Sequence, residues 1–219
     1  MRSPLLLLLA LAACEGRAPA DGPAASAPAP EAADAAEGTE NPGGTVEARG
    51  RAAGLSAAQA ARLAALDHLV VVPAALGPFA LAERPAIEVE SDSASGAFYV
   101  GLPYVGPDST CFMMRSTNDG IGDVPFGDAP SRTVRMPAFG LDAEVFQVST
   151  DPADEDAEIM GPGATGTPWV EMGSGASATF FSLLSPGNVA PGCRPASAAD
   201  VDRIVASLRP LDPERDAVH

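Results

Sequence analysis

Ser197-Ala198-Ala199-Asp200-Val201-Asp202-Arg203-Ile204-Val205-Ala206-Ser207-Leu208-Arg209-Pro210 is the stretch of the chain that decides the fold. Ser197 and Asp200 have the spacing of a capped helix start, and Pro210 ends the pattern. The apolar residues between them recur at i, i+3, i+4 and i+7, which is one face of a helix; they are Val201, Ile204, Val205 and Leu208. A helix with a single apolar face needs one surface to cover, so we expect an amphipathic C-terminal helix packed on a sheet.

The chain before this helix, from Pro73 to about residue 190, consists of short apolar or alternating runs separated by turn residues, which is typical of strands. The expected strands are Ile87–Glu90, Ala97–Leu102, Cys111–Met114, Val134–Met136, Glu144–Val148, Trp169–Met172 and Thr179–Leu184. Turn signals are Asn118-Asp119-Gly120 and Pro186-Gly187-Asn188. Because no helical pattern separates these runs, the sequence favours a mainly antiparallel sheet over a doubly wound parallel one.

Order is expected to begin at Leu55. Ser56 and Gln59 match a capping box, and apolar residues then recur on one helix side until Pro73 ends the pattern; these are Leu63, Leu66 and Leu69. We therefore predict an α+β domain over residues 55–212, with an N-terminal helix and the C-terminal amphipathic helix on the sheet, followed by a polar tail, 213–219.

The start of the chain predicts export. One arginine precedes the apolar run Leu5–Ala13, which is too short to span a bilayer but has the length of a signal-peptide core. Leu11-Ala12-Ala13-Cys14 resembles the lipobox of bacterial lipoproteins. That resemblance implies a signal peptide over residues 1–13, cleavage before Cys14, and a lipid on Cys14 that anchors the protein in a membrane. The alternative is an ordinary secretory signal with an incidental cysteine.

The lipobox reading places the domain outside the cytoplasm, on a bacterial envelope membrane, and Glu15 slightly favours the outer membrane. Residues 14–54 are expected to be a disordered tether, because they are rich in Ala, Gly and Pro and poor in large apolar residues. In an oxidising compartment an even number of cysteines favours pairing. We therefore expect a disulfide between Cys111 and Cys193.

Charge and residue types exclude several functions. The chain has 29 acidic and 13 basic residues and a net charge of −16, which argues against nucleic-acid binding and permits a cationic protein partner. All basic residues are arginine, so lysine-dependent catalysis is impossible. The two histidines, His68 in an apolar run and His219 at the end, provide neither a convincing triad nor a zinc site. We expect no enzymatic activity and no cofactor.

Two motifs have weak ligand-binding interpretations. Residues 161–166 match G-x-G-x-x-G, but the acidic segment before them and the strand-like run after them favour a loop over a dinucleotide site. Oxygen ligands suit calcium, and the acidic segment supplies candidates in Asp151, Asp154, Glu155, Asp156 and Glu158. A solvated acidic loop is the preferred interpretation, and residues 118–123 are a weaker second candidate, interpreted first as a hairpin.

Ser93-Ala94-Ser95-Gly96-Ala97-Phe98-Tyr99 resembles the Ser-rich loop of membrane-bound C-type lysozyme inhibitors, although Phe98 replaces the basic residue of that motif. The resemblance implies a loop that enters the cleft of a cationic enzyme. Three functions follow: a non-catalytic accessory or binding module with an unknown partner, which we expect, an inhibitor of a cationic envelope enzyme such as lysozyme, or a carboxylate-dependent hydrolase. A protruding acidic loop would favour the inhibitor, and a cleft with two acids about 5–9 Å apart would favour the hydrolase.

Overall fold

The computed structural model describes residues 44–66, 68–84, 86–92, 94–119, 126–173, 178–187 and 189–215. The predicted signal peptide, the lipobox with Cys14 and the tether up to residue 43 lie outside these ranges, as do Ser93, residues 120–125, residues 174–177, Asn188 and residues 216–219 with His219. None of the helices within the described ranges has the length and apolarity that a membrane span requires.

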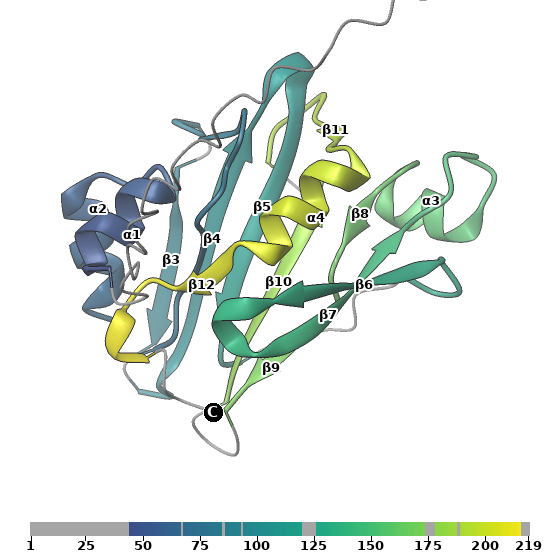
Figure 1. The fold of residues 1–219 in the computed structure, drawn as a ribbon. Helices are drawn as coiled ribbons and strands as arrows, with labels where there is room; N and C mark the ends of the chain where they lie inside the picture. Colours follow the sequence, from purple (N-terminus) through teal and green to yellow (C-terminus); the bar gives the residue numbers. More distant parts are fainter. Residues whose placement is uncertain are drawn as a thin grey trace, which may run out of the picture. The chain divides into compact units, whose positions relative to one another are not determined.

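The centre of the domain is a ten-stranded sheet, and the prediction of a mainly antiparallel sheet is confirmed (Figure 1). Its main path is β2-β4-β5-β10-β8-β7-β6, with β3 paired to β4, β9 to β10, and the short β11 parallel to β5. The strands are β2 Ala80–Leu81, β3 Glu88–Asp92, β4 Ala97–Val105, β5 Thr110–Thr117, β6 Ser131–Met136, β7 Leu141–Gln147, β8 Thr165–Gly166, β9 Val170–Met172, β10 Thr179–Ser185 and β11 Arg194–Pro195. Short 3-10 turns, Pro107–Ser109, Pro137–Phe139 and Pro213–Arg215, interrupt the connections and the predicted polar tail.

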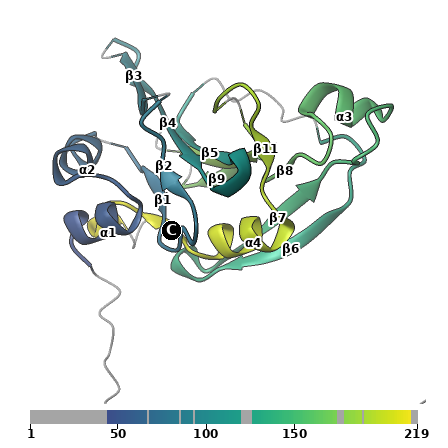
Figure 2. The same cartoon turned by 90° about the horizontal axis from the view of Figure 1, so that it is seen from above.

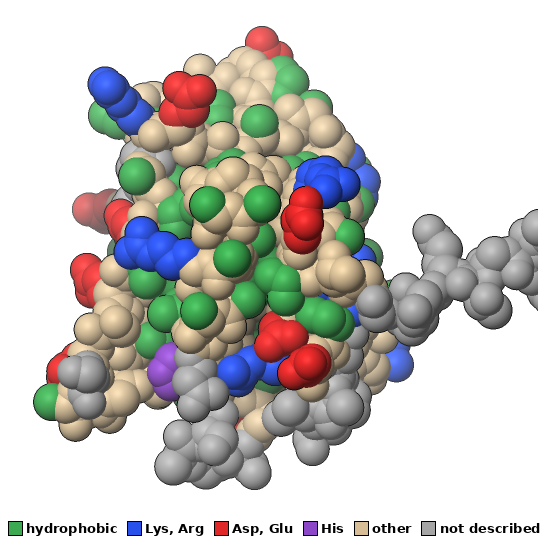
Figure 3. All heavy atoms as spheres, turned by 90° about the vertical axis from the view of Figure 1, so that its left-hand side faces the viewer, with side chains coloured by type: hydrophobic (Ala, Val, Ile, Leu, Met, Phe, Trp, Pro, Cys, Tyr) green, Lys and Arg blue, Asp and Glu red, His purple; other side chains and the backbone are tan. Residues whose placement is uncertain are grey.

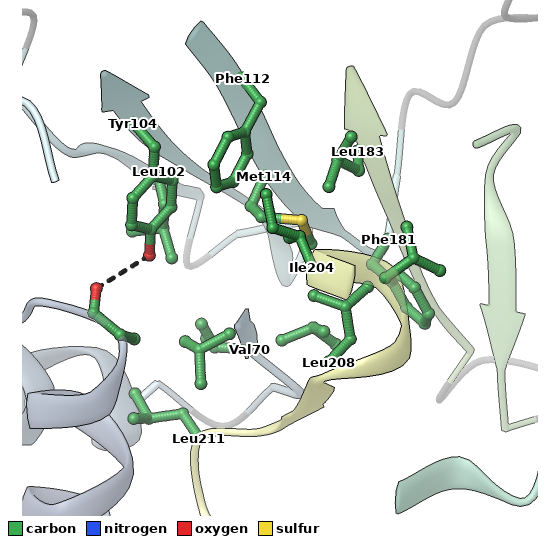
Figure 4. Packing of buried hydrophobic residues seen from close by; sticks show 14 of the residues in the cluster. Val70, Leu102, Tyr104, Phe112, Met114, Phe181, Leu183, Ile204, Leu208 and Leu211 are labelled. Carbon is green, nitrogen blue, oxygen red and sulfur yellow. Dashed lines mark hydrogen bonds between the residues drawn. The ribbon is translucent and has the colours of Figure 1, made fainter. Parts of the chain in front are cut away.

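Helix α4, Ala198–Ala206, packs on one face of this sheet. The Ser197 side chain caps it by accepting a hydrogen bond from the backbone N–H of Asp200, and Val201, Ile204 and Val205 are fully buried. Figure 4 shows Ile204 among Met114 of β5, Phe181 and Leu183 of β10 and Leu208. Seen from above, the sheet curves around α4 (Figure 2). One apolar face of the helix thus fills the concave side of the sheet.

The C-terminal helix is shorter than its apolar pattern predicts. It ends at Ala206, and Leu208 belongs to strand β12, Leu208–Pro210, which pairs antiparallel with β1, Val71–Pro73. The hydroxyl of Ser207, at the helix end, accepts hydrogen bonds from the backbone N–H groups of Ala74 and Ala75. This pairing with a distant segment overrides the local helical period, although Leu208 is still buried.

Within the described residues, helices α1 and α2 precede β1. Helix α1 spans Val46–Ala52, and α2 spans Ala57–Ala64 with a capping box between Ser56 and Gln59. The α1 helix lies in the segment predicted as tether, so the ordered domain begins before Leu55. Its Gly50 lies directly against Ala60 of α2, where a side chain on Gly50 would collide. The Ala- and Gly-rich composition that indicates disorder therefore also permits close packing of two short helices.

The predicted disulfide is present: Cys111 of β5 is bonded to Cys193, with 5.6 Å between their Cα atoms. The bond joins a central strand to the segment just before β11 and α4. It lies in a small apolar cluster with Met113 and Val189. The end of the chain is therefore attached to the sheet both through this crosslink and through the buried face of α4.

Candidate functional site

A groove of about 410 Å³ lies on the sheet face opposite α4. We call it the Arg115 groove; its floor comes from β4, β5 and β10, and α3, Glu155–Met160, forms part of its edge. Side chains alternate between the two faces of a strand. In β5 the alternation sends Phe112 and Met114 into the core with α4, and Met113 and Arg115 into the groove.

The polar part of the groove follows one row across the sheet. Glu88 of β3 is paired with Gly101 of β4, Gly101 with Arg115 of β5, and Arg115 with Ser182 of β10. The backbone register alone therefore places an acid, a glycine, a base and a hydroxyl side by side on one face.

Arg115 is half-buried, and its contacts are a hydroxyl and an indole. Its Nε donates a 3.1 Å hydrogen bond to Oγ of Ser182, and its guanidinium carbon lies 4.7 Å from the centre of the Trp169 ring. Within the described chain no carboxylate forms an ion pair with it, whereas Arg132, Arg135 and Arg203 pair with acids. Loss of hydration lowers the pKa of the Arg115 guanidinium, and the nearby Tyr99 opposes this shift.

Gly101 makes room between the two charged residues. A Cβ atom on Gly101 would lie 3.1 Å from the hydroxyl of Tyr99 and 3.2 Å from Oε2 of Glu88. The phenol of Tyr99 therefore lies over the glycine, next to the Glu88 carboxylate. Burial raises the pKa of the Tyr99 phenol, with Arg115 lowering it and Glu88 and Glu90 raising it.

The other end of the groove is apolar. Met113 and Leu184 are paired neighbours in the next row of the sheet, and Met160 and Ile159 of α3 border them. Ile159 is 59% exposed, the larger of the two exposures found among big apolar side chains in the described residues. An apolar wall beside an arginine and an acid suits a ligand that carries both charge and hydrocarbon.

The described lining of the groove contains one arginine, one carboxylate, a phenol and a hydroxyl as its polar side chains. Glu88 is the one carboxylate among its lining residues, so they do not contain the pair of acids that a glycosidase needs. His68, the described histidine, instead stacks on Phe98 with 4.1 Å between the ring centres. The lining therefore offers charge and hydrogen bonds but no nucleophile beside a base.

No family model matches the chain, and no curated protein or solved structure matches it either. On the face that carries α1 and α2, acidic and basic side chains are interspersed with apolar ones (Figure 3). That face offers no comparable concentration of groups among the residues described.

The acidic segment predicted as a loop contains α3. Asp154 caps the helix by accepting from the N–H of Asp156, and Asp151 accepts from the N–H of Ala153. Nowhere in the described ranges do three His, Cys, Asp or Glu residues form a group that could hold a metal ion. The calcium candidates Asp151, Asp154, Glu155, Asp156 and Glu158 are thus not brought together as ligands.

Of the Ser93–Tyr99 segment, residues 94–96 lie at the tip of the β3–β4 hairpin and Ala97–Tyr99 begin β4, while Ser93 lies outside the described residues. Asp92 holds this tip by accepting hydrogen bonds from the N–H of Ala94 and the hydroxyl of Ser95, which lower the pKa of its carboxyl. A hollow of about 380 Å³ beside the tip is lined by Glu90, Asp92 and Asp119 among others. The second weak calcium candidate, residues 118–123, lies mostly outside the described ranges.

Sequence reasoning missed the groove residues Arg115 and Tyr99, and Trp169 against Arg115, as a set. The predicted strand Cys111–Met114 stops one residue before Arg115, although β5 continues to Thr117. The sequence did contain one indication of the site: Arg115 is a charged residue that follows the apolar run Cys111–Met114. The cross-strand register that joins it to Glu88 and Ser182 was not in the sequence pattern.

Proposed function

We propose that this chain is a non-catalytic, lipid-anchored binding module of a bacterial envelope, with the Arg115 groove as its ligand site. One observation carries the proposal: Arg115 is half-buried in the groove without a carboxylate partner in the described chain, although acids outnumber bases 29 to 13. Acidic residues are abundant in this chain, so the sequence could easily place a carboxylate beside Arg115. Its absence from this position leaves the terminal guanidinium nitrogens for an external anion.

The energetics favour an anionic ligand. Removing a guanidinium from water is unfavourable unless it gains an anion or hydrogen bonds. Ser182 and Trp169 compensate for part of this cost and hold the plane of the group. Hydrogen bonds between arginine and a carboxylate are about twice as strong as neutral ones and are often bidentate. A ligand carboxylate would therefore complete the site.

The location is proposed on separate grounds. The lipobox at residues 11–14 supports a lipid on Cys14, and the Cys111–Cys193 disulfide supports an oxidising compartment outside the cytoplasm. With Glu15 after the cysteine, the outer membrane is favoured. Mass spectrometry of the exported protein tests this: we expect a lipid mass on Cys14, absent after Cys14→Ser. A wild-type chain that keeps residues 1–13 would refute it.

Native mass spectrometry tests the ligand site. The lipidated protein is expressed in its bacterial envelope, extracted in mild detergent and weighed under native and denaturing conditions. We expect a non-covalent mass on the wild-type protein that is lost in Arg115→Met. Arg135→Met is the matched control, because Arg135 lies on β6, pairs with Asp142 and does not line the groove.

The same small mass on all three proteins, or on none of them, would contradict the proposed site. Circular dichroism melts establish that Arg115→Met remains folded. Since Arg115 lies on the face away from α4, its replacement by an apolar side chain of similar length should leave the core intact.

A second candidate is supported by the acidic hairpin tip. Glu90, Asp92 and Asp119 line the hollow beside the Ser93–Tyr99 segment, and acidic surfaces attract basic enzymes such as lysozymes. On this view the full chain inhibits a C-type lysozyme, and inhibition weakens in Asp119→Asn but not in Arg115→Met. Full lysozyme activity at a large excess of the wild-type protein would exclude it.

A further inference from the structure

We infer that the Arg115 groove recognises a small zwitterion of peptide type: a free carboxylate at Arg115, an ammonium group at Glu88 and an apolar side chain over Met113 and Leu184. This inference rests on the proposed binding function and names the chemistry of its ligand. The row Glu88–Gly101–Arg115 carries it, because the row holds two opposite charges between which the described residues show no ion pair.

The separation of these charges fits a short peptide. Adjacent strands lie about 4.8 Å apart, so Glu88 and Arg115 are attached roughly 10 Å apart, with one strand between them. The Glu88 carboxylate lies beside Gly101, whereas the Arg115 guanidinium bonds to Ser182 on the strand beyond, and the described residues show no ion pair between Glu88 and Arg115. A dipeptide extends about 7 Å from its ammonium to its carboxylate. A dipeptide can therefore contact Glu88 and Arg115 at once, whereas a ligand with a single charged group could pair with only one of these two residues.

Gly101 and Tyr99 define the space between the charges. The glycine leaves the floor open, and the phenol hydroxyl beside it can donate to or accept from a peptide group. The row next to the charged one is apolar, since Met113 and Leu184 are its paired members. A ligand backbone lying along the charged row would thus place a side chain over these two residues, toward the exposed Ile159.

The site is less suited to a phosphate. The described lining of the groove holds one guanidinium, the chain has no lysine and the net charge is −16. A dianion would also meet the Glu88 carboxylate within the same groove. The face of the Arg115 guanidinium is covered by Trp169, which favours an in-plane, planar partner such as a carboxylate.

The test uses Trp169, the single tryptophan of the chain, as a fluorescent reporter of the groove. Leucyl-leucine, in both the L,L and D,D forms, is titrated into the mature chain, residues 14–219, carrying Cys14→Ser so that no lipid competes. N-acetyl-leucyl-leucine lacks the ammonium group, and leucyl-leucine amide lacks the carboxylate. We compare four proteins: this Cys14→Ser chain with an unchanged groove, and the same chain with Arg115→Met, with Glu88→Gln or with the control substitution Arg135→Met.

We expect saturable binding of at least one stereoisomer. Amidation should weaken binding about tenfold or more, because a charge-assisted hydrogen bond to a half-buried group is lost. Acetylation should weaken it about threefold, because Glu88 is exposed and screened by water. Each penalty should disappear in the matching variant: amidation in Arg115→Met and acetylation in Glu88→Gln. Arg135→Met should behave like wild type.

Binding that is unchanged by acetylation in the wild type would overturn the zwitterion and leave an anion site at Arg115. Absence of leucyl-leucine binding, combined with an Arg115-dependent mass in the native spectra, would overturn the inferred ligand but not the binding function. Absence of both would overturn both proposals.

Discussion

The phenol hydroxyl of Tyr104, in the middle of the core, donates a 3.1 Å hydrogen bond to the backbone carbonyl of Ala53 at the end of α1 (Figure 4). Both residues are fully buried, so this bond ties β4 of the sheet to the first helix of the domain. Burial raises the pKa of the Tyr104 phenol far above its ordinary value. The Tyr104–Ala53 contact therefore helps to attach α1 to the core, and it makes the stability of the domain depend on pH at alkaline values.

Tyr104→Phe should lower the free energy of unfolding by about 1–2 kcal/mol, because the Ala53 carbonyl stays buried without its donor. It should also change the response to alkali. A tyrosine in the unfolded chain releases its proton near pH 10, whereas the folded one keeps it, so stability falls as pH rises above about 10. Urea melts between pH 8 and 11 should show a shallower decline in Tyr104→Phe than in wild type. Equal declines would exclude Tyr104 as the group responsible.

Gly50→Ala tests whether α1 belongs to the folded domain. An added methyl group collides with the Cβ of Ala60, and overpacking of this kind costs about 1–3 kcal/mol. Gly44→Ala is the control, since the nearest atom to its new methyl is 3.8 Å away. Chemical denaturation of both variants gives the comparison. If both melt like wild type, α1 is not packed on α2 in solution.

Ile204→Ala should destabilise the domain by roughly 2–5 kcal/mol, because it leaves a cavity between α4 and the sheet. Ile204→Asp should prevent folding by burying an unpaired carboxylate. Ala199→Gln, on the exposed side of the same helix, should change stability by less than about 0.5 kcal/mol. Urea melts followed by circular dichroism measure all three. A folded Ile204→Asp protein would mean that α4 is not part of the core.

Reduction of the Cys111–Cys193 bond should lower the melting temperature by well over about 5 °C. The bond closes a loop over a sequence separation of 82 residues, and in the chain-entropy model such a loop contributes about 4–5 kcal/mol. The exported protein should show no reactive thiol before reduction. The double variant Cys111→Ala/Cys193→Ala provides the same comparison without a reductant. Two thiols that titrate freely in the native protein would contradict the pairing.

Much of the sheet was predictable because its strands are short apolar or alternating runs bounded by turn residues. The predicted runs at Ile87–Glu90, Ala97–Leu102 and Thr179–Leu184 all fall mostly within β3, β4 and β10. What the sequence could not indicate is where a distant pairing overrides a local pattern. Leu69 continues the spacing of Leu63 and Leu66, yet α2 ends at Ala64, and the chain beyond it forms strand β1, which pairs with Leu208–Pro210.

The candidate site was less predictable than the fold. Glu88, Arg115 and Ser182 lie far apart in the chain, and only the register of four strands brings them into one row. The acidic segment shows the converse. Its clustered carboxylates suggested a calcium site, yet Asp151 and Asp154 accept hydrogen bonds from backbone N–H groups two residues further along the chain. In this protein, a cluster of charged residues in the sequence is therefore a weaker indication of a binding site than the register of neighbouring strands.

The two ends of the folded unit are fastened to each other. Nη1 of Arg49 donates a 3.0 Å hydrogen bond to the carbonyl of Pro210, and β1 pairs with β12 nearby. A mechanical pull on the chain at Gly44 would load α1 first, and with it the Arg49–Pro210 hydrogen bond, before it loaded the strands of the sheet. If the chain is anchored through Cys14, as proposed above, such a pull would reach α1 and the Arg49–Pro210 contact before the strands that form the groove.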